Sequence, residues 1–463
     1  MIRGLTARQV LLVAFETVLI VFAVAVAGFA RLGADGWTVL FGDGPSILKT
    51  LLLAGVTQTC LYVADLYDFR VVADRRELFV RILQALGSAS FVLAVVYFFL
   101  PNTMVGRGIF TLAVILIIVF VASWRILFGW LDQRMAPRER LLLVGTNDAA
   151  VTLARELHER RQELGVSIVG FVDPDPAKVG QPVVNPGVIG AVEDIPAIVR
   201  SRNVDRVVVS LTDARGKLPM NRLLEMKLAG GVTFDYLASV YEEYTGKIAV
   251  ENLRPSWMIF SDGFKKSRPI EFGKRTLDLV IASVMFVVLL PVMALVALAV
   301  KLSSAGPALY HQKRVGLNGQ VFLVHKFRSM RTDAEAKTGA VWAKANDTRV
   351  TSVGRFLRRT RLDELPQLWN VLRGDMSLVG PRPERPEFVA ELTEKIPFYG
   401  FRHVVRPGLT GWAQVRYTYG ASVEDALEKL QYDLFYIKHL GISFDIFVML
   451  STLKIVVLRR GAQ

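Results

Sequence analysis

The residues from Leu279 to Val300 read LVIASVMFVVLLPVMALVALAV, an uncharged and mostly apolar run of 22 positions. A helix of that length could cross a hydrocarbon core of about 30 Å. Pro291 interrupts the run near its middle, where a proline removes one helix hydrogen bond and kinks the chain. We therefore expect a re-entrant helix over residues 276–301, which enters one leaflet, bends at Leu290-Pro291 and returns to the same side. A simple crossing is the alternative.

Basic residues on both sides of this run favour the re-entrant helix. Lys and Arg are retained on the cytoplasmic side of a membrane, and a crossing would carry the basic remainder of the chain to the opposite side. A last apolar segment, Phe444–Leu458, is followed by Arg459 and Arg460 and is expected to lie in the membrane interface. The flanking basic residues are Lys265, Lys266, Arg268, Lys274 and Arg275 before the run, and Lys301, Lys313 and Arg314 after it.

Four earlier apolar stretches of membrane-spanning length define a first region, residues 1–137. Arginines are frequent before the first, between the second and third, and after the fourth, so the N-terminus and everything after Arg134 should be cytoplasmic. Three more spans follow the first, which argues against a cleaved signal peptide. No span carries a pair of acidic residues, so we expect an anchor rather than a transport path. The stretches are Val10–Ala30, Ile47–Ala64, Leu78–Leu83 with Ala85–Leu100, and Ile109–Trp130.

The composition agrees with a membrane protein that has a positive pole. Hydrophobic residues make up 52% of the 463 positions and charged residues 21%, which excludes a disordered chain and disfavours an ordinary soluble enzyme. The net charge is +14, and from Lys265 onward 30 basic residues face 17 acidic ones. Such a region suits anionic lipid headgroups, phosphorylated substrates or nucleic acid. The single cysteine, Cys60, excludes an internal disulfide framework and a Cys-rich metal site.

Residues 138–262 have the pattern of an α/β Rossmann-like domain. Strand-like segments alternate with helical ones, which favours a parallel, doubly wound sheet. The first strand is followed by Gly145 and an amphipathic helix to about Leu164, but only one of the three glycines of a dinucleotide-binding turn is present. We therefore expect a degenerate domain with a structural or regulatory role and no bound cofactor. The predicted strands are Leu141–Val144, Ile168–Val172, Val207–Leu211 and Val232–Leu237.

The chemistry is concentrated in the segment Arg349–Glu384, which reads RVTSVGRFLRRTRLDELPQLWNVLRGDMSLVGPRPE. Asp363 and Glu364 are expected to begin a helix that Gly374 ends. The helix dipole and nearby arginines should keep both carboxylates ionised. An ionised Asp among cations can attack phosphorus, and its neighbour can hold Mg²⁺ together with substrate phosphates. The alternative is that Asp363 is a helix cap and Glu364 an ordinary first-turn acid.

Cationic motifs surround this acidic pair in the sequence. Arg382 stands between two prolines in Gly380-Pro381-Arg382-Pro383, an arrangement that suits bidentate phosphate binding. Each motif alone could be a solvated surface charge, but their recurrence around one acidic pair favours a phosphate site. The candidate substrate- and phosphate-binding residues are Lys274, Arg275, Arg314, Lys326, Arg328, Arg358, Arg361, Arg382 and Arg406.

The C-terminal 200 residues resemble the bacterial sugar transferase family, the monotopic polyprenyl-phosphate phosphoglycosyltransferases that begin exopolysaccharide and O-antigen assembly. The four spans and the degenerate Rossmann-like domain resemble the large-form members. Six motifs carry the resemblance: Lys274-Arg275 with Asp278, Gly306-Pro307 through Gln312-Lys313-Arg314-Val315-Gly316, Lys326-Phe327-Arg328-Ser329-Met330, Leu362-Asp363-Glu364-Leu365-Pro366-Gln367, Gly380-Pro381-Arg382-Pro383-Glu384, and Arg406-Pro407-Gly408.

The resemblance implies a mainly α catalytic domain over residues 263–463 and a two-step reaction. The Asp matching Asp363 takes the sugar phosphate from a UDP-sugar with release of UMP, and polyprenyl (undecaprenyl) phosphate then accepts it. The Glu matching Glu364 is associated with Mg²⁺, the arginines matching Arg358 and Arg382 with the phosphates, and the proline matching Pro291 with the re-entrant break. A bacterial inner-membrane location with cytoplasmic globular domains and downstream glycosyltransferases as partners are implied. A homodimer and the identity of the sugar remain open.

Two other classes of function remain as alternatives. A membrane-anchored nucleotide-sugar dehydratase or epimerase would need a complete glycine fingerprint and a Tyr-x-x-x-Lys pair, and no Tyr here has Lys four residues later. A non-catalytic scaffold for polysaccharide assembly would not need an acidic pair ringed by basic motifs. Nucleic-acid binding is disfavoured because the chain has no basic-aromatic interleaving and no recognised module.

Overall fold

The computed structural model describes residues 7–64, 66–67, 75–135, 139–211, 218–250, 263–264, 266–331, 334, 349–417, 420 and 422–457. These residues form two compact units that meet in the sequence between Val240 and Tyr241, within helix α11 (Leu237–Thr245). The first unit contains a helical bundle and an α/β domain, and the second contains the acidic pair.

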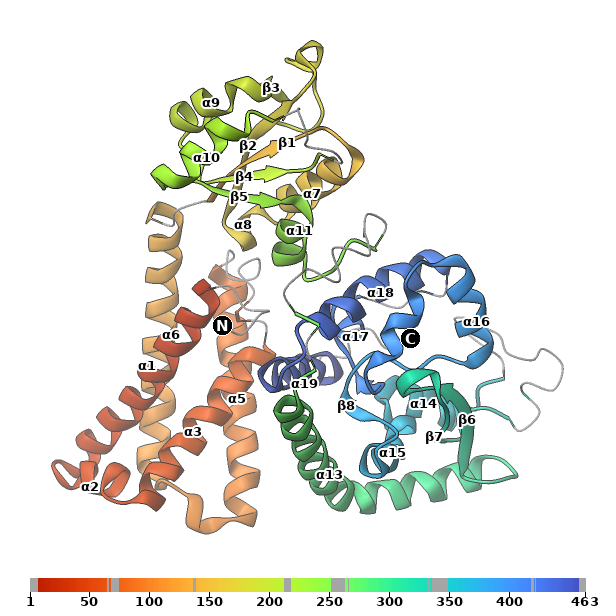
Figure 1. Ribbon diagram of the computed structural model, residues 1–463. Helices are drawn as coiled ribbons and strands as arrows, with labels where there is room; N and C mark the ends of the chain where they lie inside the picture. The colour runs from red at the N-terminus through yellow and green to blue at the C-terminus, as the bar shows by residue number, and fades with distance from the viewer. Residues whose placement is uncertain are drawn as a thin grey trace. The chain divides into compact units, whose positions relative to one another are not determined.

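Long helices form at each of the four predicted apolar stretches (Figure 1). They are α1 (Ala7–Leu32), α3 (Gly44–Val63), α5 (Arg75–Phe99) and α6 (Arg107–Met135). All four are long and apolar enough to cross a membrane. The short helix α2 (Asp35–Phe41) and a 3₁₀ turn over Pro101–Thr103, neither of which we predicted, lie in the connections.

A buried ion pair joins the first and last helices of this bundle. Arg125 of α6 lies with its Nε 2.7 Å from Oε1 of Glu16 on α1, and both side chains are excluded from solvent. The Tyr67 hydroxyl donates to Glu16 and accepts from Gln58 Nε2 at 2.6 Å. Arg125 also donates to the Leu66 carbonyl. We missed this pair in the sequence because its charges are 109 residues apart.

The α/β domain is a parallel, doubly wound sheet, as predicted. Its strand order is β3-β2-β1-β4-β5, with every pairing parallel. Helices α9 (Ile195–Arg202) and α10 (Met220–Ala229) cover one face, and α7 (Asp148–Glu159), followed by α8 (Arg161–Leu164), covers the other (Figure 1). The strands are β1 (Glu139–Val144), β2 (Val166–Asp173), β3 (Val188–Ala191), β4 (Arg206–Val209) and β5 (Thr233–Tyr236), of which only β3 was not predicted.

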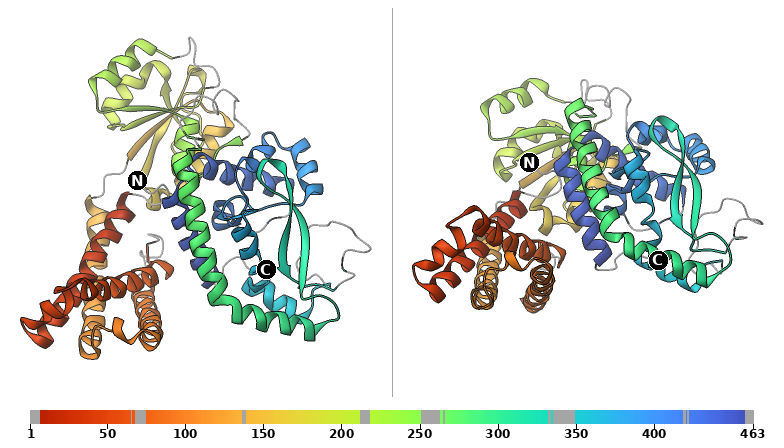
Figure 2. Two further views of the ribbon diagram at one scale, coloured as in Figure 1. Left: turned by 60° about the horizontal axis from the view of Figure 1, so that its bottom comes forward. Right: turned by 90° about the horizontal axis from the view of Figure 1, so that it is seen from below.

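The second unit begins with one helix that contains Pro291. Helix α13 runs from Arg268 to Ser303, longer at both ends than predicted, and Figure 2 shows it bending sharply about halfway along. Much of its apolar surface is exposed, including Val287 at 70% and Leu295 at 67%. The helix and its bend are therefore confirmed, whereas its entry into one leaflet stays a prediction.

The rest of this unit is mainly helical, as expected, with two small sheets that we did not predict. Strands β6 (Leu309–Val315) and β7 (Val321–Phe327) form an antiparallel hairpin, and β8 (Ser377–Val379) pairs in parallel with β9 (Gly408–Thr410). The helices are α14 (Ser352–Thr360), α15 (Gln367–Arg373), α16 (Pro386–Lys395), α17 (Trp412–Arg416), α18 (Val423–Lys438) and α19 (Ile442–Val457), with 3₁₀ turns at Leu317–Gly319, Leu362–Glu364 and Tyr399–Val404.

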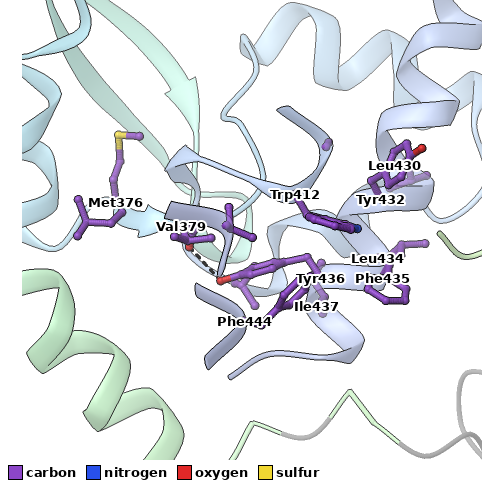
Figure 3. Packing of buried hydrophobic residues seen from close by; sticks show 14 of the residues in the cluster. Met376, Val379, Trp412, Leu430, Tyr432, Leu434, Phe435, Tyr436, Ile437 and Phe444 are labelled. Atoms are coloured by element: carbon purple, nitrogen blue, oxygen red, sulfur yellow. Dashed lines mark hydrogen bonds between the residues drawn. The ribbon is translucent and has the colours of Figure 1, made fainter. Parts of the chain in front are cut away.

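The core of this unit forms around Trp412 (Figure 3). Its ring lies within 5.2–6.2 Å of Phe435 and Phe444, and its Nε1 donates to the Gly246 carbonyl at 2.8 Å. The buried Tyr436 hydroxyl donates to the Val379 carbonyl at 3.0 Å. This bond attaches α18 to the end of β8, directly before the Gly-Pro-Arg-Pro segment.

We predict that Arg125→Leu destabilises the helical bundle by about 3–5 kcal/mol, because it leaves the Glu16 carboxylate buried without its partner. The matched control is the double variant Glu16→Leu/Arg125→Leu, which removes both charges and should recover most of the loss. Thermal unfolding of the full chain in detergent measures both. A double variant as unstable as the single one would contradict this account of the pair.

Candidate active site

The acidic pair lies in a tight turn before α15. Arg361 ends α14 in the left-handed conformation (φ 59°), and Leu362, Asp363 and Glu364 then form a single 3₁₀ turn. Gly374, also left-handed at φ 98°, ends α15 as predicted. The expectation that the pair begins this helix is corrected, because α15 starts only at Gln367 and the turn before it is separate.

The Glu364 carboxylate is largely buried and is surrounded by three cationic side chains. Its Oε1 lies 2.5 Å from Arg382 Nη2 and 3.1 Å from Lys326 Nζ, with Arg361 Nη1 at 4.0 Å. Burial opposes ionisation of this carboxyl, but Arg382 and Lys326 outweigh it and hold the pKa of Glu364 well below its usual range. Glu364 is therefore ionised at neutral pH, as expected.

Asp363 lies in the same cluster but in a different electrostatic state. Its side chain is 7% exposed, and its Oδ1 is buried without a hydrogen-bond partner among the residues that the structure describes. Burial and the charge of Glu364 raise the pKa of Asp363 to about 6, against the opposing effect of Lys326, Arg358 and Arg382. We expected the cations and the helix dipole to lower the pKa of both acids. For Asp363 this expectation is corrected, because desolvation has the larger effect on its pKa. A carboxyl with a pKa of about 6 is still mostly ionised at pH 7.

Arg382 is held by its backbone as well as by Glu364. The neighbouring Gly380 donates to the Thr410 carbonyl at 2.9 Å, and a Cβ on Gly380 would come within 2.4 Å of the Arg406 carbonyl oxygen. Only glycine permits this close approach between the two segments. Arg402 then donates to the Arg382 carbonyl at 2.9 Å.

Arg402 is itself fixed by a buried acid. Its Nη2 lies 2.8 Å from Asp433 Oδ2 on α18, and its Nη1 donates to the Tyr399 hydroxyl. Sequence reasoning missed both Arg402 and Asp433. The available signal was an Asp in the otherwise mostly apolar stretch Leu430–Ile437, since a buried charge requires a partner.

Two arginines near Ser329 have different neighbours. Arg358 Nε donates to Ser329 Oγ at 2.9 Å, and the Arg358 charge favours ionisation of Asp363. Arg328 donates instead to the carbonyl and hydroxyl of Ser304, just beyond the end of α13. Arg358 therefore contributes to the electrostatics of the acidic pair. Arg328, which directly follows β7, attaches the end of that strand to the end of α13.

The other predicted cations contact structural groups. Lys274 donates to Asp445, the Val379 carbonyl and the Tyr436 hydroxyl. Arg275 donates to the carbonyls of Val371 and Leu372 at the end of α15, Arg406 to that of Gly374, and Arg314 to that of Pro383 and to Glu384. For all four of these cations, phosphate binding stays a prediction, and the contacts observed hold together the elements that carry the site.

Asn370 is a further residue that sequence reasoning missed. Its Oδ1 accepts from the His325 backbone N–H at 3.1 Å, and its Nδ2 donates to the Leu323 carbonyl at 2.7 Å. These bonds attach α15 to β7, which carries Lys326. The amide therefore sets the distance between the lysine and the acidic pair.

The acidic pair suits a magnesium ion only together with substrate. Among the described residues no group of three His, Cys, Asp or Glu side chains could hold a metal. Mg²⁺ commonly binds one or two carboxylates plus substrate phosphates. The unpartnered Oδ1 of Asp363 and the adjacent Glu364 carboxylate fit that pattern.

The Gly145 turn of the α/β domain is occupied by its own side chains. Thr146 Oγ1 donates to Asp173 Oδ2 at 2.6 Å, and Lys178 Nζ lies 3.2 Å from the same oxygen. Asn147, which caps α7, donates to the Ser210 carbonyl at the end of β4. These contacts link the segments that follow β1, β2 and β4 at the carboxyl edge of the sheet.

We predict that Asp363→Asn is more stable than the wild type by about 1–3 kcal/mol above pH 7. The folded-state pKa of Asp363 lies above its unfolded value, so its stabilising effect is complete below about pH 4 and is lost as the pH rises through 6. Asparagine does not titrate, so the difference between the two proteins should appear between pH 4 and 6. Thermal unfolding in detergent across pH 4–8 measures it, and a less stable variant at pH 7 would contradict the assignment.

Two family models match the chain. A family model described as bacterial sugar transferase matches residues 270–459, and one described as CoA-binding domain matches residues 62–222. No dinucleotide-type cofactor was expected in the second region, and the match leaves that expectation untested.

Curated relatives match much of the chain. An Aeromonas hydrophila UDP-N-acetylgalactosamine-undecaprenyl-phosphate N-acetylgalactosaminephosphotransferase is 37% identical over 56% of this chain and 60% of its own length. A Komagataeibacter xylinus undecaprenyl-phosphate glucose phosphotransferase is 33% identical over 76% of this chain and 65% of its own. The chain thus spans less than two thirds of these two relatives. An Escherichia coli UDP-glucose:undecaprenyl-phosphate glucose-1-phosphate transferase is 35% identical over 71% of this chain and 70% of its own length. The chain belongs to the bacterial sugar transferase family.

Proposed function

We propose that this protein transfers a sugar 1-phosphate from a UDP-sugar to undecaprenyl phosphate, with Asp363 as the nucleophile. The relatives named above carry this class of activity in their names. The observation that carries the proposal is the Asp363 carboxylate, which is buried beside the three cations Lys326, Arg358 and Arg382 and has one oxygen without a hydrogen-bond partner among the described residues. An oxygen in that state is available to form a bond to phosphorus.

In the first step an oxygen of Asp363 bonds to the phosphorus that carries the sugar. The bond from that phosphorus to the bridging oxygen breaks, and UMP leaves with that oxygen. In the second step an oxygen of undecaprenyl phosphate attacks the same phosphorus and regenerates the carboxylate. In each step the negative charge of the transferred phosphoryl group lies beside Asp363. Arg358, Arg382 and Lys326 would neutralise that charge.

The raised pKa of Asp363 is consistent with this role. A strongly acidic carboxylate would be a weak nucleophile and would leave easily, while one with a pKa of about 6 is ionised at pH 7 and more basic. Glu364 has the opposite character, since its pKa is held well below the usual range and its charge is permanent. The two neighbouring acids are therefore suited to different tasks.

Glu364 would hold a magnesium ion, which would supply neutralisation of the substrate phosphate charge. In this structure Lys326 and Arg382 hold Glu364. Both side chains are cationic and can instead bind phosphate oxygens once a substrate enters. Their release would leave Glu364 free to bind the ion.

The membrane location of the proposed reaction rests on the apolar helices. Within the described residues five helices are long and apolar enough to cross a membrane, including α13. We propose that α13 lies in the cytoplasmic leaflet of the inner membrane, with the acidic pair near the headgroups. The exposed apolar residues Ile446, Leu450 and Leu453 of α19 support an interfacial position for that helix as well.

We predict metal-dependent release of UMP from one member of a panel of UDP-sugars. The panel should include UDP-glucose and UDP-N-acetylgalactosamine, since these sugars occur in the names of the relatives. The assay uses the full chain in membranes with undecaprenyl phosphate and Mg²⁺. Asp363→Asn should lower the rate by at least 10³-fold, while Glu387→Gln, whose side chain is 60% exposed, should leave it unchanged.

Substantial turnover by Asp363→Asn would exclude Asp363 as the nucleophile. Release of UMP without formation of a lipid-linked product would restrict the activity to hydrolysis. No UMP from any sugar, with the wild type folded as judged by thermal unfolding, would contradict the proposed reaction.

We also predict that both ends of α13 face the cytoplasm. In a Cys60→Ser background, a cysteine at Ser303 should react with a membrane-impermeant maleimide only when the cytoplasmic side is accessible. Asn102→Cys, between α5 and α6, is the matched control and should react from the opposite side. Labelling of the Ser303 cysteine from the same side as the Asn102 cysteine would show that α13 crosses the membrane.

A further inference from the structure

Two histidines face each other across the β6–β7 hairpin. His311 and His325 are directly opposite in the antiparallel register, and their Nδ1 atoms are 2.6 Å apart. The rings are nearly perpendicular, with centroids 4.7 Å apart. The His311 side chain is exposed and that of His325 is half-buried, so the pair is accessible from solvent.

The pair lies on the face of the hairpin opposite to the acidic pair. Side chains alternate along a strand. Lys326, which contacts Glu364, follows His325, and Arg314, which contacts Glu384, is an odd number of residues from His311. The histidines are therefore distinct from the site described above, although the same two strands carry both.

The close approach of the two rings requires that they share a proton. An Nδ1–H on one ring donates to the lone pair of the other, whereas two imidazolium ions would repel each other. One proton between the two Nδ1 atoms accounts for their 2.6 Å separation, so two ring nitrogens converge on one point of the hairpin.

We propose that His311 and His325 form a chelating site for a divalent transition-metal ion such as Zn²⁺, Ni²⁺ or Cu²⁺. Neutral imidazole is a preferred ligand of these ions, whereas Mg²⁺ selects oxygen. Metal–nitrogen bonds of about 2.0–2.1 Å in a tetrahedral site place the two nitrogens roughly 3.3 Å apart. The rings would therefore have to separate by less than about 1 Å, which small side-chain rotations allow.

The rest of the coordination shell must come from outside the pair. No group of three His, Cys, Asp or Glu ligands is found in the described part of the chain, so the site has two protein ligands and open positions for water. Asn370 donates to the Asp375 carboxylate at 3.3 Å and accepts from the backbone N–H of His325 at 3.1 Å, so this carboxylate lies near the pair. A two-histidine site of this kind binds metal reversibly rather than as part of a permanent structural centre.

The experiment uses the full chain, purified in detergent without a histidine tag and freed of metal by chelator. Equilibrium dialysis with Zn²⁺ should give one bound equivalent that Mg²⁺ does not displace. His311→Ala and His325→Ala should each weaken binding at least tenfold. His158→Ala is the matched control, since His158 is an exposed histidine of α7, and it should bind as the wild type does.

Cu²⁺ paramagnetic resonance of the wild type gives a measurement that needs no variant. Nitrogen couplings from two imidazoles are expected, and couplings from one imidazole or from oxygen ligands alone would overturn the proposal. Zn²⁺ binding that is unchanged in His311→Ala/His325→Ala would also overturn it. The proposal is independent of the sugar transferase reaction, so either result leaves that function to its own test.

Discussion

The structure of the second unit depends on placing two adjacent carboxylates where water is largely excluded. Glu364 and Asp363 share one buried turn, and two negative charges at that separation repel each other strongly in a medium of low dielectric. Lys326 and Arg382 compensate for Glu364 through contacts of 3.1 Å and 2.5 Å. At Asp363 burial and the charge of Glu364 together outweigh the nearby cations, and the pKa of that carboxyl is raised.

Successive layers of contacts keep those cations in place. The close approach of Gly380 to the Arg406 carbonyl and the hydrogen bond from Arg402 fix the backbone around Arg382, and Asp433 in turn neutralises Arg402. Asn370 attaches the strand of Lys326 to α15. These contacts orient the cations before any substrate arrives.

The sequence was most informative where a pattern is local. Long apolar helices, the strands of the α/β sheet and the stop at Gly374 follow from periodicity and from the conformational freedom of glycine. Strand β3 is only four residues long and lies among glycines and prolines, so it carried too little periodicity. The acidic pair and its cations were identified from motif and resemblance, but their electrostatic balance was not. Desolvation of Asp363, the Arg402–Asp433 pair and the register that opposes His311 to His325 all depend on residues distant in the sequence.

Pro291 also removes one backbone donor from α13. Pro291 has no N–H, so the carbonyl of Val287, four residues earlier, lacks the donor that it would have in a continuous helix. In hydrocarbon such a group costs several kcal/mol unless water or a polar side chain reaches it. A helix that bends within one leaflet would therefore carry a point of hydration to its deepest position.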